Sequence, residues 1–251
     1  MRIDLNADLG EAYGAWQLGD DTAMLTVVTS ANVACGFHAG DPLTIRRTVV
    51  EAARLGVRVG AQVSYPDLAG FGRRFMDLSA DELAADVLYQ LGALDGMCRA
   101  AGTRIAYVKP HGALYNRVVA DRVQAGAVLD ALDAFDPELP ILGLPGSALL
   151  GLAGERGRRG VAEAFADRAY QPDGSLVSRR EPGAVLLDAA TIAERMVALA
   201  TTGELTAVDG TRLVLQADSI CVHGDSPDAV GIARAVRTAL AEAGVSIEAF
   251  G

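Results

Sequence analysis

The sequence is poor in cysteine, in long apolar runs and in dense basic segments. Its three cysteines are too few and too widely spaced for a disulfide framework or a structural zinc site. No apolar run approaches the ~20 residues that a membrane span requires, and the N-terminus has no signal-peptide pattern, so we expect a cytoplasmic protein that does not enter a membrane. The net charge of −10 and the shortness of the basic cluster at 156–159 argue against a nucleic-acid partner.

Lysine is scarcer still, because Lys109 is the only one among the 251 residues. It follows the apolar segment 105–108, which has the pattern of a buried strand, and Pro110 and His111 come directly after it. In parallel α/β folds, catalytic groups lie where strands run into loops. We therefore expect Lys109 to be a catalytic residue.

Histidine and asparagine are also rare and share this placement. Each histidine follows an apolar, strand-like segment and each asparagine lies within or beside one: His38, His111, His223, Asn6, Asn32 and Asn116. Any single one of these residues could merely cap a turn. Because capping residues would have no reason to avoid the other loops, we interpret the set as one shared polar site.

Apolar, strand-like segments alternate with helix-like segments along the chain. The predicted strands lie near the N-terminus and at 29–35, 57–63, 105–108, 141–144, 161–165 and 219–222. This alternation predicts a parallel sheet that closes, or nearly closes, into a barrel, and we expect residues 1–251 to form a single α/β domain. An open doubly wound sheet is the alternative, but the first turn has no phosphate-binding glycine fingerprint and the chain has no Walker loop.

Three further segments complete the expected architecture. A single helix is predicted from about 118 to 134, before the fifth strand. Residues 176–180 interrupt the alternation and are interpreted as a short strand or a lid. The turn at 208–211 lies between two apolar runs and predicts a local antiparallel hairpin.

Acidic residues accompany the predicted strand ends. Asp8 shares one strand face with Asp4 and Asn6, and acids on a buried face need a histidine, a lysine or a metal as partner. Asp8 and Glu11 lie nearest the end of that strand, so both are candidate catalytic residues, with turn or cap roles as the alternative. Asp167 is a candidate binding residue, or only the salt-bridge partner of the arginine that follows it.

Two loops are candidates for covering a ligand. Residues 64–74 mix glycines, aromatic residues and the paired arginines Arg73 and Arg74, which suits a small anionic ligand, although an ordinary surface loop has a similar composition. In the loop at 36–42, Asp41 is explained as the cap of the helix that begins at Pro42. His38 has no such structural explanation and is kept as a site residue.

Five segments resemble the LamB/YcsF family. They are DLNADLGE at 4–11, SANVACGFHAGDP at 30–42, GFGRR at 70–74, KPHGALYN at 109–116 and CVHGD at 221–225. The resemblance runs from the first strand to the last and implies a TIM-like (β/α)7 barrel of the glycoside hydrolase/deacetylase type. One departure concerns a Gly-Ala-His-Pro segment that is common in the family, where this chain has Gly60, Ala61, Gln62 and Val63.

The resemblance also implies an activity. It predicts that the chain works with two partner subunits to open 5-oxo-L-proline to L-glutamate, with ATP as co-substrate and hydrolysis to ADP and phosphate. A five-membered lactam is an unactivated amide, so coupling to ATP is a reasonable way to activate its carbonyl oxygen as a phosphorylated species. Because this chain has no nucleotide-binding motif, we expect the partner subunits to supply the ATP site.

On this hypothesis, Lys109 stabilises negative charge on oxygen and His111 exchanges protons with the attacking water or the leaving nitrogen. Asp8 orients a histidine or the water, and Glu11 and His38 complete the expected catalytic set. Arg73 holds the substrate carboxylate. The expected substrate-binding residues are Asn6, Asn32, Arg73, Asn116, Asp167 and His223.

Two other functions remain open. In the first, Asp8, His38 and His111 form a two-histidine, one-carboxylate set that binds a divalent ion such as zinc or manganese, and the protein is a deacetylase or amidohydrolase that works without ATP. In the second, the chain is a non-catalytic scaffold for the partner subunits. If the chain is a scaffold, substitutions at Lys109 and His111 should have no effect, whereas either catalytic function predicts that they reduce activity.

Overall fold

The structure is a computed structural model that describes residues 1–224 and 228–250. In this part of the chain, seven parallel strands close into a barrel. The strands pair in chain order, and the last one pairs with both the sixth and the first, which closes the ring. They are β1 (Arg2–Leu9), β2 (Ser30–Ala34), β3 (Arg58–Val63), β4 (Ile105–Pro110), β5 (Ile141–Gly143), β6 (Gly160–Phe165) and β9 (Ser219–Val222). The predicted TIM-like (β/α)7 barrel is confirmed, and the open doubly wound sheet is excluded.

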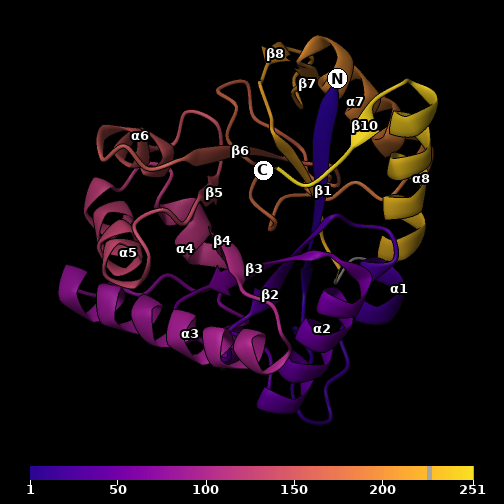
Figure 1. Cartoon of the computed structure of the whole chain (residues 1–251). Coiled ribbons are helices and arrows are strands. Elements are labelled where there is room, and N and C mark those ends of the chain that lie inside the picture. The colour runs from indigo at the N-terminus through magenta and orange to yellow at the C-terminus, as the bar shows by residue number, and fades with distance from the viewer. Residues whose placement is uncertain (225–227, 251) are drawn as a thin grey trace.

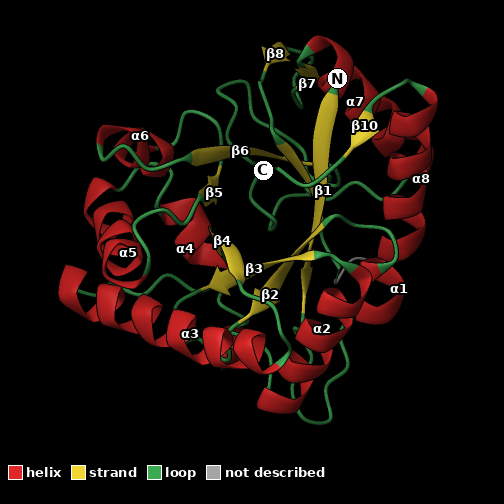
Figure 2. Ribbon diagram, viewed as in Figure 1, coloured by secondary structure: helices red, strands yellow, loops and turns green. Residues whose placement is uncertain are grey.

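Helices surround this ring of strands (Figure 1), and the separation of an inner strand layer from an outer helix layer is plain in Figure 2. None of the helices within the described ranges is both long enough and apolar enough to cross a membrane. The helices are α1 (Asp21–Leu25), α2 (Pro42–Leu55), α3 (Ala80–Ala100), α4 (Gly112–Arg117), α5 (Arg122–Phe135), α6 (Ala148–Glu155), α7 (Ala189–Thr202), α8 (Ala229–Glu242) and the short 3-10 helix η1 (Leu68–Gly70).

Two helix starts follow from local side-chain chemistry. Asp41 caps α2 by accepting hydrogen bonds from the backbone amides of Leu43 and Thr44. Ser79 and Glu82 form a reciprocal capping box at the start of α3. The start at Asp41 was predicted from the sequence and is confirmed.

The barrel interior contains a polar layer. Asn6 of β1 donates to Glu163 Oε1 of β6 at 3.0 Å and to Ser219 Oγ of β9 at 2.7 Å. Because β1 and β6 are not adjacent in the sheet, the first of these hydrogen bonds crosses the interior. Asn32 of β2 donates to Asn6 Oδ1 at 2.7 Å and accepts from the Tyr107 hydroxyl at 2.6 Å. The polar face of β1 therefore points into the barrel rather than towards the helices.

One predicted helix begins later than expected. The helix predicted from about 118 to 134 is α5, which begins at Arg122, and the short helix α4 before it, which ends at Arg117, was not predicted. Asp121 accepts hydrogen bonds from the backbone amides of Val123 and Gln124 and so starts α5 separately. The predicted start was wrong because this capping aspartate was taken for part of the helix.

The irregular stretches had different outcomes. The antiparallel hairpin expected around 208–211 is confirmed as β7 (Glu204–Thr206) and β8 (Arg212–Val214). Residues 176–180, all of them described, form no strand of a ladder, and Leu176 makes only an isolated bridge with Tyr170. The short strand β10 (Ser246–Ile247), which pairs with the start of β1, was not predicted. Asp225, in the last of the five family-like segments, lies outside the described residues.

Gly60 of β3 provides a test of how tightly the barrel interior is packed. A Cβ at this position would lie 2.2 Å from ring atoms of Tyr107, which is fully buried and packs against Phe250. We expect Gly60→Ala to lower the free energy of unfolding by about 1–3 kcal/mol, because overpacking forces neighbouring groups to shift. Urea unfolding midpoints measure the effect.

The matched control is Gly92→Ala. Gly92 is exposed on α3, and a Cβ there would meet nothing within 4 Å. This variant should be more stable than the original protein by up to about 1 kcal/mol, because alanine is the better helix former. Equal midpoints for Gly60→Ala and the original protein would show that the interior is looser than the structure indicates.

Candidate active site

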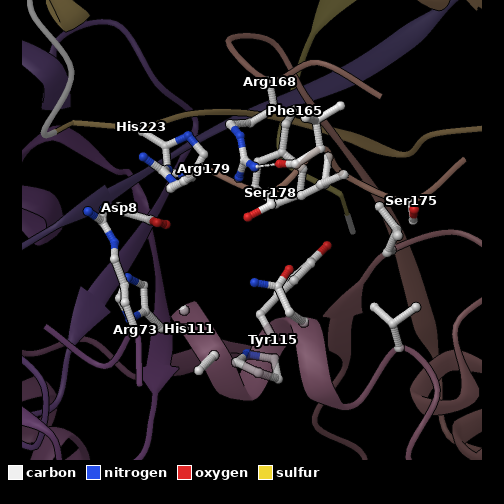
Figure 3. Close-up of a pocket in the computed structure, with 18 of the residues that line it drawn as sticks. Asp8, Arg73, His111, Tyr115, Phe165, Arg168, Ser175, Ser178, Arg179 and His223 are labelled. Carbon is white, nitrogen blue, oxygen red and sulfur yellow. Dashed lines mark hydrogen bonds between the residues drawn. The ribbon is translucent and has the colours of Figure 1, made fainter. Parts of the chain in front are cut away.

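A cavity of about 690 Å³ opens where the carboxyl ends of the strands meet. Figure 3 shows side chains from several strands and loops pointing towards it. The closed barrel brings these strand ends together although they are far apart in the sequence. The predicted site residues that line the cavity are Asp8, Arg73, Lys109, His111, Asn116 and His223.

Lys109 near the end of β4 is buried at this cavity, with 2% of its side chain exposed. Its Nζ lies 2.9 Å from Asp8 Oδ1 and 3.1 Å from Glu163 Oε1. It also donates to Cys221 Sγ at 3.1 Å. Strands β1, β6 and β9 therefore each supply one partner to the same ammonium.

These contacts set the charges of the cluster. Burial alone would lower the pKa of Lys109, but the nearby carboxylates, Asp8 foremost, outweigh it and hold that pKa well above its ordinary value. Burial acts to raise the pKa of Asp8, yet the Lys109 ammonium holds it below its ordinary range. For Glu163, burial prevails and the pKa is raised. Asp8 is therefore the permanent counterion of Lys109, and Glu163 is the acid that takes up a proton more readily.

Asn6 and Asn32 support this cluster from below. Asn32 donates to Asp8 Oδ1 at 2.8 Å, and Asn6 donates to Glu163 Oε1 at 3.0 Å. Both asparagines are fully buried and neither lines the cavity. They hold the two carboxylates in place, so the prediction that they contact substrate is not supported by their position.

A second cluster joins His38, His111, Glu11 and Gln62. The imidazole rings are stacked with centroids 4.1 Å apart, and Glu11 Oε1 lies 3.7 Å from Nε2 of each ring. Gln62 donates to Glu11 Oε1 at 3.1 Å, and its Oε1 lies 3.2 Å from His38 Nε2. Gln62, at the position where the sequence departs from the common family pattern, therefore fixes the relative positions of Glu11 and His38.

Both imidazoles are kept neutral. Burial lowers the pKa of His38 to about 4. Burial, followed by the neighbouring His38, holds the pKa of His111 well below its ordinary value. A neutral imidazole can accept a proton or bind a metal ion. One donor atom from each of Glu11, His38 and His111 lies within 4.8 Å of the others, so the carboxylate of a possible metal set is Glu11 rather than the predicted Asp8, which is bound to Lys109.

The loop after β3 covers the histidine pair. Phe71 packs edge-on against His38 and His111, with centroids 5.8 and 5.3 Å away, and the guanidinium of Arg73 lies 4.9 Å from the centroid of the Phe71 ring. Gly72 has a φ of 67°, and a Cβ there would lie 2.9 Å from His38 Cβ and 3.0 Å from His111 Nδ1. Glycine thus allows the backbone to lie directly against both histidines.

His223 and Asp167 form the opposite side of the cavity. His223 Nδ1 lies 2.8 Å from Asp167 Oδ1, and the imidazole stacks on Phe165 with centroids 5.3 Å apart. Asp167 is fully buried and does not line the cavity, so its contact with the cavity is made through His223. Asn116 on α4 is exposed at the cavity margin.

Several residues at the site were not among the predicted ones, and Glu163, Arg168 and Arg179 are the charged ones of most interest. Glu163 could have been found as a lone charge on an otherwise apolar strand. Arg168 and Arg179 line the cavity, but nothing in the sequence separates them from the other arginines. Some of the predicted site residues line the cavity, namely Asp8, Arg73, Lys109, His111, Asn116 and His223. The others lie behind these lining residues: Glu11, His38, Asn6, Asn32 and Asp167.

Comparison with known proteins places this geometry in context. The model of the LamB/YcsF family matches residues 3–251. The chain is 65% identical over 248 residues to the 5-oxoprolinase A-subunit of Mycobacterium avium, covering 99% of this chain and 98% of the relative. It is 60% identical to a 5-oxoprolinase A-subunit of Agrobacterium fabrum, covering 99% of this chain and 97% of the relative.

Solved structures agree with these sequence matches. A lactam utilization protein from Thermus thermophilus superposes over 100% of both chains with a TM-score of 0.94 and 47% identity. A polysaccharide deacetylase from Bacillus cereus has a TM-score of 0.51 and 14% identity, covering 100% of this chain and 93% of that chain, and shows the shared barrel fold alone. From the nearly full-length family match and these identities, we conclude that the chain belongs to the LamB/YcsF family.

Proposed function

We propose that this protein is the lactam-opening subunit of an ATP-dependent 5-oxoprolinase, which converts 5-oxo-L-proline to L-glutamate. The observation that carries the proposal is a cavity lined by the buried ammonium of Lys109 and the neutral imidazole of His111, in a chain 65% identical to a 5-oxoprolinase A-subunit. A buried cation and a neutral base are the two groups that amide cleavage needs.

ATP and partner subunits complete the proposed reaction. The lactam, ATP and two water molecules give glutamate, ADP and phosphate. The relatives are named as one lettered subunit of 5-oxoprolinase, which supports the existence of further subunits, and we infer two of them. Since the chain has no glycine fingerprint and no Walker loop, we assign the ATP site to these partners.

The residues of the cavity take distinct roles. Lys109 stabilises the negative charge that develops on oxygen, because its charge is fixed and shielded from water. His111, which is neutral and lines the cavity, takes a proton from the attacking water and returns it to the leaving nitrogen. Arg73 binds the carboxylate of the substrate.

The other residues act through these three. Asp8 and Glu163 hold Lys109 in place and set its pKa. Glu11, His38 and Gln62 hold the ring of His111. His223, positioned by Asp167, lies across the cavity.

The cluster of Glu11, His38 and His111 also favours a second candidate function, a metal-dependent amidohydrolase. Two neutral imidazoles and one carboxylate are a donor set suited to zinc or manganese, so the residues fit such an ion. When bound, the ion would act as a Lewis acid and would lower the pKa of a water molecule bound to it. This function would not require ATP.

Glutamate release tests the first proposal. We expect release from 5-oxoproline and ATP when this chain is mixed with its partner subunits, and none from the chain alone or from the partners alone. His111→Asn should slow release by about a hundredfold to ten-thousandfold, because it removes the proton acceptor. Arg46→Gln, an exposed change on α2, is the control and should leave the rate unchanged. A fully active His111→Asn variant would contradict the role given to this imidazole.

Metal loading separates the two functions. The first proposal predicts that the chain alone, supplied with zinc or manganese, opens no lactam and removes no acetyl group in the absence of ATP. Metal analysis of the purified protein, with assays before and after chelation, checks this. ATP-independent hydrolysis that is lost on chelation and in His38→Asn would establish the metal hydrolase instead.

A further inference from the structure

The outward face of α3 is unusual for a surface helix. Between the first and last turns of this fully described helix, every exposed residue is uncharged, namely Ala85, Leu88, Tyr89, Gly92, Ala93 and Gly96. Surface helices normally carry charged and polar residues opposite the face that packs on the core. The neighbouring helix α2 follows this rule, with Arg46 and Arg47 exposed. Because α3 is largely apolar on both faces, it has the pattern of a helix that packs against partners on both sides.

Large and small side chains are separated along this face. Leu88 and Tyr89 are 39% and 67% exposed, and the Tyr89 ring stacks on Phe37 of the loop after β2 with centroids 5.5 Å apart. One and two turns further on, a Cβ at Gly92 or Gly96 would meet nothing within 4 Å among the described residues. Glycine is the poorest helix former after proline, so two exposed glycines weaken the helix and contact nothing within the chain. The face therefore has a raised half followed by a flat half.

Charge is confined to the two ends of the face. The exposed charged residues of α3 are Asp81 and Glu82 in the first turn and Arg99 in the last turn. Arg99 Nε lies 2.7 Å from Asp95 Oδ2, yet the arginine side chain is 78% exposed, and a guanidinium has further donors to offer. A face with acids at one end and a base at the other is complementary to a reversed copy of itself.

We propose that this face of α3 binds a second copy of the chain, with the two α3 helices antiparallel across a twofold axis. In such an interface the same patch serves both copies, so each contact occurs twice. With the axis at the middle of the helix, Leu88 of each copy lies opposite Gly92 of the other. Asp81 of each copy likewise lies opposite Arg99 of the other. The glycines allow the two helices to approach closely.

Charge is the reason for choosing a second copy as the occupant. The chain has a net charge of −10, so two copies repel each other unless opposite charges meet where they touch. Antiparallel pairing of α3 provides two such meetings, one at each end of the interface. It also sets the raised half of each face against the flat half of the other. Parallel pairing would instead bring acids against acids and leave the glycines facing each other.

Antiparallel pairing leaves both active-site cavities accessible. α3 follows β3, which ends at the cavity, and precedes β4, which begins at the opposite end of the barrel. The helix therefore runs along the side of the barrel, as Figure 1 shows. Reversing α3 in the second copy reverses its barrel as well, so the two cavities open in opposite directions. Each cavity remains free for the proposed partner subunits.

Sedimentation velocity of the full chain, from micromolar to millimolar concentration, tests the dimer. We expect the mass to rise from that of one chain towards that of two. Gly96→Gln should weaken association at least about tenfold, because the added side chain holds the helices apart. The variant should stay folded, because glutamine is a better helix former than glycine. A monomer over the whole range, or a dimer that Gly96→Gln does not weaken, would overturn the proposal.

The matched control is Gly151→Gln. Gly151 is an exposed glycine of α6, and a Cβ there would also meet nothing within 4 Å among the described residues. This variant adds the same side chain to a helix outside the proposed interface, so it should dimerise like the original chain. Equal weakening in both glutamine variants would remove α3 from the interface.

An exchange of charge tests the direction of the pairing. Asp81→Arg and Arg99→Glu each set like charges against each other at both contacts, so each variant alone should dimerise about tenfold more weakly. A mixture of the two variants should associate like the original chain, because the arginines of one meet the acids of the other. Arg46→Glu, the same charge change on exposed α2, should dimerise normally. A mixture that associates no better than the separate variants would contradict the antiparallel arrangement.

Binding of the proposed partner subunits gives the competing outcome. We expect Gly96→Gln to remain bound to those subunits when the complex is purified, although the variant no longer dimerises. A chain that is always monomeric, and that loses the partner subunits in Gly96→Gln but not in Gly151→Gln, would assign the face to a different subunit. That result would overturn the second copy as its occupant and leave the proposed function standing.

Discussion

The ion cluster around Lys109 is the constraint on which the mouth of the barrel depends. An ammonium that is almost fully buried needs partners within hydrogen-bonding distance, and these come from Asp8 and Glu163 on two different strands. The two carboxylates need donors of their own, which Asn32 and Asn6 supply from the layer beneath. The polar interior of the barrel is thus the support for one charge. Burying this polar interior costs stability, and the apolar packing between the strands and the surrounding helices offsets that cost.

The same cavity maintains two opposite electrostatic environments. Beside Lys109, ion pairing overcomes burial and keeps the pKa of the ammonium raised and that of Asp8 lowered. Around His38 and His111, burial prevails and the imidazoles remain neutral. Groups with pKa values moved apart by their surroundings are what a site needs in order to combine a fixed charge with a mobile proton. Gln62 belongs to the second environment, because an uncharged amide joins Glu11 to His38 without adding charge.

Much of the fold could be predicted from the sequence, because strand-like runs with glycine and polar residues at their ends are local patterns. The convergence of Asp8, Lys109, His111 and His223 followed from the parallel barrel itself. What could not be predicted depends on contacts across the barrel. Asn6 and Asn32 were expected at the substrate but lie beneath Asp8 and Glu163. Only the closed ring shows that Glu11 lies within 3.7 Å of both stacked histidines, while Asp8 is paired with Lys109. The start of α5 was predicted about four residues too early because the capping role of Asp121 was not recognised.

The most direct test of the importance of the ion cluster compares Lys109→Met with the double change Lys109→Met and Asp8→Asn. The single variant leaves buried carboxylates without a counterion, so unfolding should require about 3–5 kcal/mol less free energy. The double variant should recover much of that loss, because Asp8 no longer carries a charge. Glutamate release by the complete complex should be abolished in both. Near-normal release by either variant would contradict the account, because the ammonium would then serve only the fold.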